Sequence, residues 1–217
     1  MATIRFIGDV HGKVDRYKEI VQGGANDITI QVGDFHVEYG DEVSWCSKAD
    51  LPKTGMDNYI IPGNHDDWEW ILKHAKDPIT DAPFFYSGTL DYFSSNLHIC
   101  WVAGAASVDK NHNPDWNPNE EMGMAQALQI ADCYKNEWEN IDVIVSHDCP
   151  YQILFDMYHS SQVEKTKTNE LLQHMFDTKA PKLWVFGHHH QRFVRIIGDT
   201  TFVGLGECDY FDYTFPS

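Results

Sequence analysis

Short polar motifs that each begin where an apolar run ends are the feature that most constrains the fold of this chain. Apolar runs of this length and Val/Ile/Phe content are typical of buried strands. In an open α/β sheet the carboxyl ends of the strands lie at one edge, where ligands bind. The motifs should therefore converge on one site. They are Gly8-Asp9-Val10-His11-Gly12 after Thr3–Ile7, Gly33-Asp34 after Ile28–Val32, Gly63-Asn64-His65-Asp66 after Tyr59–Ile61, Ser146-His147-Asp148 after Ile141–Val145, and Gly187-His188-His189-His190 after Leu183–Phe186.

The alternation of apolar runs with helix-like stretches predicts a single α/β domain over residues 1–217, which is enough chain for one sizeable core. Gly198-Asp199 is a turn signal and predicts a hairpin near the C-terminus. An Asn- and Pro-rich loop is expected from Ser107 to Glu121. Further strands are expected at His98–Ala103, Phe193–Ile197 and Thr201–Gly204, and helices at Val14–Val21, Asp67–His74, Glu120–Ala131 and Lys165–Phe176.

The chain is strongly acidic, with 33 Asp and Glu against 16 Lys and Arg and a formal net charge of −17. Such a surface repels a phosphate backbone, so duplex nucleic acid is not an expected partner. Bound divalent cations would cancel part of the charge locally, so a small anionic substrate can still enter one pocket. No apolar run approaches the roughly 18 residues that span a bilayer. A membrane partner is therefore not expected either.

The cysteines are scattered along the chain, and none belongs to a Cys-x-x-Cys pair. This pattern favours neither a disulfide framework nor a zinc–thiolate site. Buried small side chains in a reducing compartment are the simplest interpretation, so a cytoplasmic location is expected. The residues concerned are Cys46, Cys100, Cys133, Cys149 and Cys208.

The side chains in the motifs are carboxylates, an amide and imidazoles, which together suit divalent ions such as Mn, Fe or Zn. Each motif alone is weak evidence, because a lone Gly-Asp or a lone His is more often a turn or a hydrogen-bonded polar residue. Several such motifs at successive strand ends are not independent coincidences. The number of such side chains converging on one site implies more than one divalent ion.

From Asp9 to His190 the motifs resemble, in order, those of the calcineurin-like metallophosphoesterase superfamily. The segment Gly104–Lys110 is similar to one in small bacterial and phage members. The resemblance implies a two-sheet β-sandwich flanked by helices, in four layers, and a metal-dependent hydrolase of phosphoric esters. It also implies two divalent metal ions, with Mn as the first choice and Fe, Zn, Ni or Mg as alternatives. Asp9, His11 and His190 would hold one metal, Asn64, His147 and His188 would hold the other, and Asp34 would bridge both.

His65 follows the expected ligand Asn64 but is not itself a ligand in the family that the chain resembles. An imidazole can carry a proton at neutral pH, so His65 is expected to act as the general acid for the leaving group. Asp66 is expected to accept a hydrogen bond from the other ring nitrogen. Asp148 is either a similar hydrogen-bond partner near the metals or a surface residue.

Three residues are candidates for contact with substrate. His36 lies where protein-phosphatase members have an acidic residue followed by Arg, and it either contacts substrate or is structural. Lys110 and Asn111 could donate hydrogen bonds to a phosphate, although Lys110 could instead pair with a neighbouring Asp in its loop. His189 stands where the family does not require His, so it is expected to be a solvent-exposed bystander.

Three functions remain open. The first is hydrolysis of phosphomonoesters or small phosphodiesters, with nucleotides as candidates because aromatic residues near the motifs could stack a base. The second is a Ser/Thr protein phosphatase, which the missing Arg disfavours, as does Asp66 in place of the Glu usual in that branch. The third is a catalytically silent metal-binding scaffold, which is disfavoured because every expected ligand position is filled. The aromatic residues are Phe35, Trp68, Trp116 and Tyr151.

Overall fold

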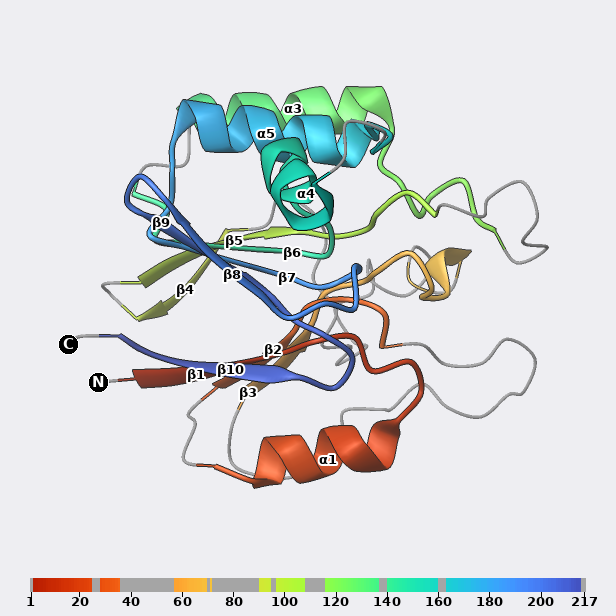
Figure 1. Ribbon diagram of the computed structural model, residues 1–217, viewed down its shortest axis with the longest axis vertical. Coiled ribbons are helices and arrows are strands. Elements are labelled where there is room, and N and C mark those ends of the chain that lie inside the picture. Colours follow the sequence, from red (N-terminus) through yellow and green to blue (C-terminus); the bar gives the residue numbers. More distant parts are fainter. Residues whose placement is uncertain are drawn as a thin grey trace.

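The computed structural model describes residues 2–24, 28–35, 57–69, 71, 90–94, 97–107, 116–136, 140–159 and 163–215. Figure 1 shows two β-sheets packed face to face between helices. Helix α1 (Val14–Gln22) covers the outer face of one sheet. The outer face of the other sheet is covered by α3 (Met124–Asn136), α4 (Tyr151–Tyr158) and α5 (Lys167–Thr178). The predicted sandwich flanked by helices is confirmed.

The smaller sheet has the strand order β10-β1-β2-β3. Its strands are β1 (Ala2–Ile7), β2 (Ile28–Gln31), β3 (Asp57–Ile60) and β10 (Tyr210–Phe215). β1, β2 and β3 are parallel, and β10 is antiparallel to β1. Because β1, β2 and β3 are parallel, the three motifs that follow these strands lie at the same edge of the sheet, as the sequence predicts.

The larger sheet has the order β4-β5-β6-β7-β9-β8. Its strands are β4 (Leu90–Ser94), β5 (Leu97–Val102), β6 (Val143–Ser146), β7 (Leu183–Phe186), β8 (Phe193–Ile197) and β9 (Thr200–Gly204). β5, β6, β7 and β9 run parallel, whereas β4 and β8 are antiparallel edge strands. The hairpin predicted around Gly198-Asp199 is confirmed as β8–β9.

Alternation along the strands explains the layers, because successive side chains point to opposite faces of a sheet. Ile4 and Phe6 of β1 are buried between the two sheets, in the same cluster as Val143 and Val145 of β6. Ile144, between those two valines, packs instead in the cluster beneath α3, α4 and α5. β6 is therefore apolar on both faces, which is why it appears in the sequence as a continuous apolar run.

Three elements were not expected from the sequence: α4, β4 and β10. β10 escapes detection because its residues alternate between exposed and half-buried and include Asp212, so it has no apolar run. α3 begins at Met124 rather than at Glu120, since the Glu120 carboxylate accepts a hydrogen bond from the Asn117 amide and stays with the preceding loop. The helix predicted from Asp67 is described only at Trp68, Glu69 and Ile71.

No described helix combines the length and the apolar character that crossing a membrane requires.

A buried arginine joins the edge strand β10 to the rest of the molecule. Arg5 is 4% exposed, and its Nε and Nη2 donate to the two carboxylate oxygens of Asp212, both at 2.7 Å. Asp212→Ala would leave the guanidinium inside the fold without that carboxylate, so we expect a loss of about 2 kcal/mol in unfolding free energy, measured by urea denaturation. Glu19→Ala removes an exposed pair with Arg16 and should cost under about 0.5 kcal/mol. Equal losses would contradict the structural role of Arg5.

Candidate metal centre and active site

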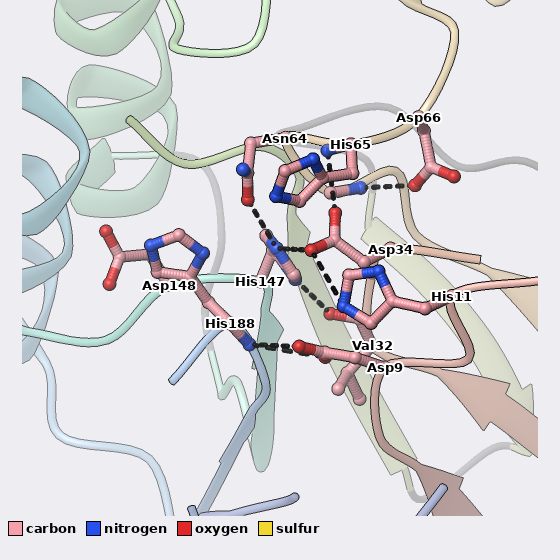
Figure 2. A network of polar contacts seen from close by, with 12 residues as sticks. Asp9, His11, Val32, Asp34, Asn64, His65, Asp66, His147, Asp148 and His188 are labelled. Carbon is pink, nitrogen blue, oxygen red and sulfur yellow. Dashed lines mark hydrogen bonds and ion pairs between the residues drawn. The ribbon is translucent and has the colours of Figure 1, made fainter. Parts of the chain in front are cut away.

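The expected ligands lie on the segments that follow β1, β2, β3, β6 and β7, at the carboxyl ends of these strands, and Figure 2 labels all of them except His190. Their metal-binding atoms form two groups that share the Asp34 carboxylate, and within each group those atoms lie within 4.8 Å of one another. One group is Asp9, His11, Asp34 and His190, and the other is Asp34, His147 and His188. The convergence predicted from the motifs is what the fold produces.

In the first group, ring nitrogens and carboxylate oxygens face one another. His190 Nε2 lies 3.1 Å from Asp9 Oδ2 and 2.8 Å from His11 Nε2. His11 Nε2 lies 3.7 Å from Asp34 Oδ2. Two imidazole nitrogens that approach so closely, beside two carboxylates, form a donor set suited to a divalent cation.

In the second group, His147 Nε2 lies 3.0 Å from Asn64 Oδ1 and 3.3 Å from Asp34 Oδ2. The other ring nitrogen, Nδ1, is 2.9 Å from the carbonyl oxygen of Val32 and must donate to it. This bond fixes the orientation of the ring and directs Nε2 into the site, as is usual for a metal-ligating histidine. Asn64 is itself oriented, since its Nδ2 donates to Ser107 Oγ at 3.0 Å.

The backbone at the site is held in conformations that L-residues rarely adopt. Four of the expected ligands have positive φ: His11 (46°), Asp34 (52°), His188 (64°) and His190 (49°). Residues in this region cost free energy and cluster at functional sites, where the surrounding fold holds them. Strand ends that turn so sharply let the side chain fold back over the sheet edge.

Gly187 makes room for a ligand. A Cβ at this position would collide with Asp9 Oδ1, which the amide of the next residue, His188, approaches at 3.2 Å. We expect Gly187→Ala to displace the Asp9 carboxylate and to weaken metal binding by roughly tenfold or more, measured by isothermal titration calorimetry. Gly123→Ala is the matched control, because its Cβ would meet nothing within 4 Å. Equal metal affinity in the two variants would show that Asp9 is not a ligand.

The residues fit a pair of cations. Asp34 is 1% exposed, and its Oδ2 makes an ion-pair contact with His147 but no hydrogen bond of normal geometry with any described residue. A buried carboxylate oxygen without a donor is costly. This oxygen lies between the two groups, at 3.7 Å from His11 Nε2 and 3.3 Å from His147 Nε2. Cations held on either side would satisfy it, and so the position of Asp34 suits a bridging ligand.

Burial and charge set the protonation of the centre. Burial alone would raise the pKa of Asp34, but neighbouring His147 holds that pKa below its ordinary value. Burial lowers the pKa of His147, but the Asp34 carboxylate outweighs this effect and raises that pKa above its usual range. For His188, burial lowers the pKa to about 3, and it also lowers the pKa of His11. Neutral imidazoles of this kind can offer a lone pair to a cation.

His65 and Asp66 lie in the same turn beyond β3 (Figure 2). The His65 amide donates to Asp34 Oδ1 at 2.8 Å, and its ring stands edge-on to that of His11 with centroids 5.5 Å apart. Asp66 is fully buried, and its Oδ2 accepts from the Gly63 amide at 2.7 Å. This bond closes the turn that carries Asn64. The expected bond between Asp66 and the His65 ring stays a prediction.

His189 is not a solvent-exposed bystander, so that expectation is wrong. Its side chain is 10% exposed, and its Nε2 lies 3.0 Å from Asp148 Oδ1. Its Nδ1 lies 3.3 Å from the hydroxyl of Tyr158 on α4. Asp148 is 2% exposed, and although burial opposes it, the hydrogen bond to His189 lowers its pKa to about 2. Tyr158 was missed because nothing in the sequence of α4 marks it as adjacent to a motif.

The three expected substrate contacts, His36, Lys110 and Asn111, lie outside the described residues. The described ends of the loop that contains Lys110 and Asn111 are joined by a hydrogen bond. Ser107 Oγ donates to Glu120 Oε2 at 2.5 Å, and both side chains are buried. Because Ser107 also accepts from Asn64, this loop supports a proposed ligand.

Comparison with known proteins agrees with this geometry. The family model for the calcineurin-like phosphoesterases matches residues 2–192. No curated protein matches the chain. Among solved structures, the protein TT1561 of Thermus thermophilus is similar, with a TM-score of 0.66 and 14% identity over 95% of this chain and 90% of that one.

Two further structures share the fold. A phosphopantetheinyl hydrolase from Mycobacterium tuberculosis has a TM-score of 0.52 and 14% identity, over 95% of this chain and 90% of its own. An NAD nucleotidase of Haemophilus influenzae has a TM-score of 0.53 and 13% identity, and 98% of this chain matches 53% of that longer one. At these identities the likeness concerns the fold.

Proposed function

Because this chain belongs to the calcineurin-like phosphoesterase family and is thereby a metal-dependent phosphoester hydrolase, we propose that it hydrolyses phosphomonoesters or small phosphodiesters at a centre of two divalent cations. The observation that carries the proposal is the shared Asp34 carboxylate. Its Oδ2 is buried and forms no hydrogen bond of normal geometry with any described residue. It lies close to a ring nitrogen of each group, His11 Nε2 and His147 Nε2.

The proposed ligand set keeps the assignment made from the sequence. Asp34 is shared, and Mn is the proposed metal. When bound, the cations supply Lewis acidity that activates water and neutralises phosphoryl oxygens. The two sets of ligands are Asp9, His11 and His190 on one side, and Asn64, His147 and His188 on the other.

The protein's own residues then have distinct tasks. Asp34 Oδ1 holds the His65 amide, so the bridging carboxylate also positions the turn that carries the proposed acid. As the bond between phosphorus and the leaving oxygen breaks, that oxygen takes a proton from the His65 ring. Asp66 holds the turn closed through the Gly63 amide. The buried Val32 carbonyl and Ser107 hydroxyl keep His147 and Asn64 aimed at the centre.

A small, single-pocket substrate agrees with the net charge of −17, which disfavours duplex nucleic acid. Nucleotides are the proposed class, in keeping with the name of the nucleotidase that shares the fold. A cytoplasmic location is also proposed, since the described cysteines, Cys100, Cys133, Cys149 and Cys208, are free thiols.

A substrate panel with Mn²⁺ tests the proposal. It compares p-nitrophenyl phosphate, bis-p-nitrophenyl phosphate, cyclic nucleotides, dinucleoside polyphosphates and a phosphopeptide, each with and without EDTA. We expect EDTA-sensitive hydrolysis of the small esters. Preference for the phosphopeptide would favour a protein phosphatase. Absence of hydrolysis with both metals bound would overturn the proposal in favour of a scaffold.

A further inference from the structure

A cavity of about 590 Å³ lies beside the second group of ligands. It is lined by α4, the start of α5, and the segments that follow β5, β6 and β7. That volume is in the range of small-molecule sites, roughly 300–1,000 Å³. Its described lining includes the proposed ligand His188 but not His65, His11 or His190. For a phosphate held at the metal centre, the ester oxygen stays there with the proposed acid His65, and the group attached to that oxygen extends past His188 into this cavity.

The two lysine side chains in the described lining of the cavity each already have a partner. Lys167 Nζ lies 3.4 Å from Glu121 Oε2, and Lys165 Nζ stands 4.4 Å from the centroid of the Tyr151 ring. Glu164 and Asp148 are further carboxylates in the lining. Among the described lining residues there are thus three carboxylates, with Glu121, against two ammonium groups. A second phosphate or an acidic peptide would meet net repulsion here.

The start of α5 offers no anion site either. Glu121 Oε1 accepts hydrogen bonds from the amides of Lys167, at 2.6 Å, and Thr168, at 3.3 Å. The hydroxyl of Thr166 accepts from the Asn169 amide at 3.1 Å. The amides that bind phosphate at an open helix N-terminus are thus already satisfied by the protein. The group that enters this cavity should carry no negative charge.

The lining instead matches a flat group with apolar faces and polar edges. Leu154 and Val163 supply apolar surface, and the ring of Tyr158 is available because the residue is 46% exposed. The hydroxyl end of that ring is held by His189 Nδ1 at 3.3 Å, and His189 is held in turn by Asp148. Because this contact already fixes the tyrosine side chain, a ligand that packs on the face of the ring causes little further loss of side-chain entropy.

We propose that this cavity binds the nucleoside of a nucleoside monophosphate, with Tyr158 in contact with the base. The inference rests on the proposed phosphoesterase function, since it places the phosphate at the metal centre. It narrows that function to esters whose leaving group is neutral, and it excludes nucleoside polyphosphates and phosphoproteins as preferred substrates.

The test compares nucleoside 5′-monophosphates with methyl phosphate, whose leaving group is also a primary alcohol but is too small to fill the cavity. For the Mn²⁺-loaded protein we expect kcat/KM to be at least about tenfold higher for the nucleotides, since base stacking alone supplies an effect of that size. Tyr158→Ala should reduce this preference by roughly tenfold, chiefly through KM. The preference is taken as the ratio of kcat/KM for the nucleotide to kcat/KM for methyl phosphate within one variant, so that an effect common to both substrates cancels.

Phe155→Ala is the matched control, because Phe155 is an aromatic residue of α4 with 44% exposure that does not line the cavity. Binding of adenosine, guanosine, cytidine and uridine by calorimetry gives a readout that is independent of turnover. Binding that weakens in Tyr158→Ala but not in Phe155→Ala supports the cavity assignment, even if no ester is hydrolysed and the proposed function falls. Hydrolysis of methyl phosphate with neither nucleotide preference nor nucleoside binding overturns the cavity assignment alone.

Discussion

Asp34→Ala should lose both metal ions and phosphoesterase activity together. The substitution removes the only carboxylate that belongs to both groups of ligand atoms among the described residues. It also removes the acceptor of the His65 amide, so the turn that carries Asn64 loses a support. We expect a fall in kcat/KM of about a thousandfold or more, the scale at which electrostatic stabilisation of a transition state is lost. Metal content by mass spectrometry of the desalted protein is the parallel measurement.

Two controls separate loss of the ligand from damage to the fold. Asp34→Asn keeps the side-chain shape and tolerates the left-handed backbone at φ 52°, yet removes the charge, and it should also lose metal. Asp142→Ala removes a carboxylate that pairs with Lys182 at the opposite end of β6, and it should keep both ions. If Asp34→Asn retained two ions and full activity, Asp34 would not be the bridging ligand.

His65→Gln should keep both metals and lose most of its turnover. The structure supports this separation, because the substitution preserves the hydrogen bond from the backbone amide of residue 65 to Asp34 Oδ1. Loss of a general acid lowers kcat by about 10²- to 10⁴-fold. The loss should be larger for alkyl phosphates than for p-nitrophenyl phosphate, because p-nitrophenolate leaves without needing a proton.

The leaving-group dependence distinguishes an acid from a residue that merely packs near the metals. His174→Gln, an exposed histidine on α5, provides the control and should match the wild type on every substrate. Metal content is measured in parallel for all three proteins. Full activity of His65→Gln on an alkyl phosphate would remove the acid role from His65.

Most of the fold could be predicted from residues that are buried on both faces of a strand. β6 and β7 are fully buried, so their runs stand out in the sequence. β10 could not be predicted in the same way, because one of its faces is exposed and it depends on pairing with β1, more than two hundred residues away. The division of the strands between two sheets also arises from long-range pairing, which no local pattern encodes.

The site was more predictable than the fold, because its residues carry their chemistry in short motifs. Asp9 and His11 share one turn, and the glycines beside the ligands mark close approaches such as that of Gly187 to Asp9. The contacts that could not be predicted join distant segments: Ser107 with Glu120, and His189 with Tyr158. These contacts depend on how α4 and the loop pack over the strand ends, and they shape what lies next to the metals.

The most direct test of the metal centre is a calorimetric titration of the metal-free protein with Mn²⁺, with activity on p-nitrophenyl phosphate assayed at each point. The structure predicts two ions per chain and activity that rises as the second ion binds. Saturation at one ion, or full activity in the metal-free protein, would contradict a shared Asp34 carboxylate between two cations.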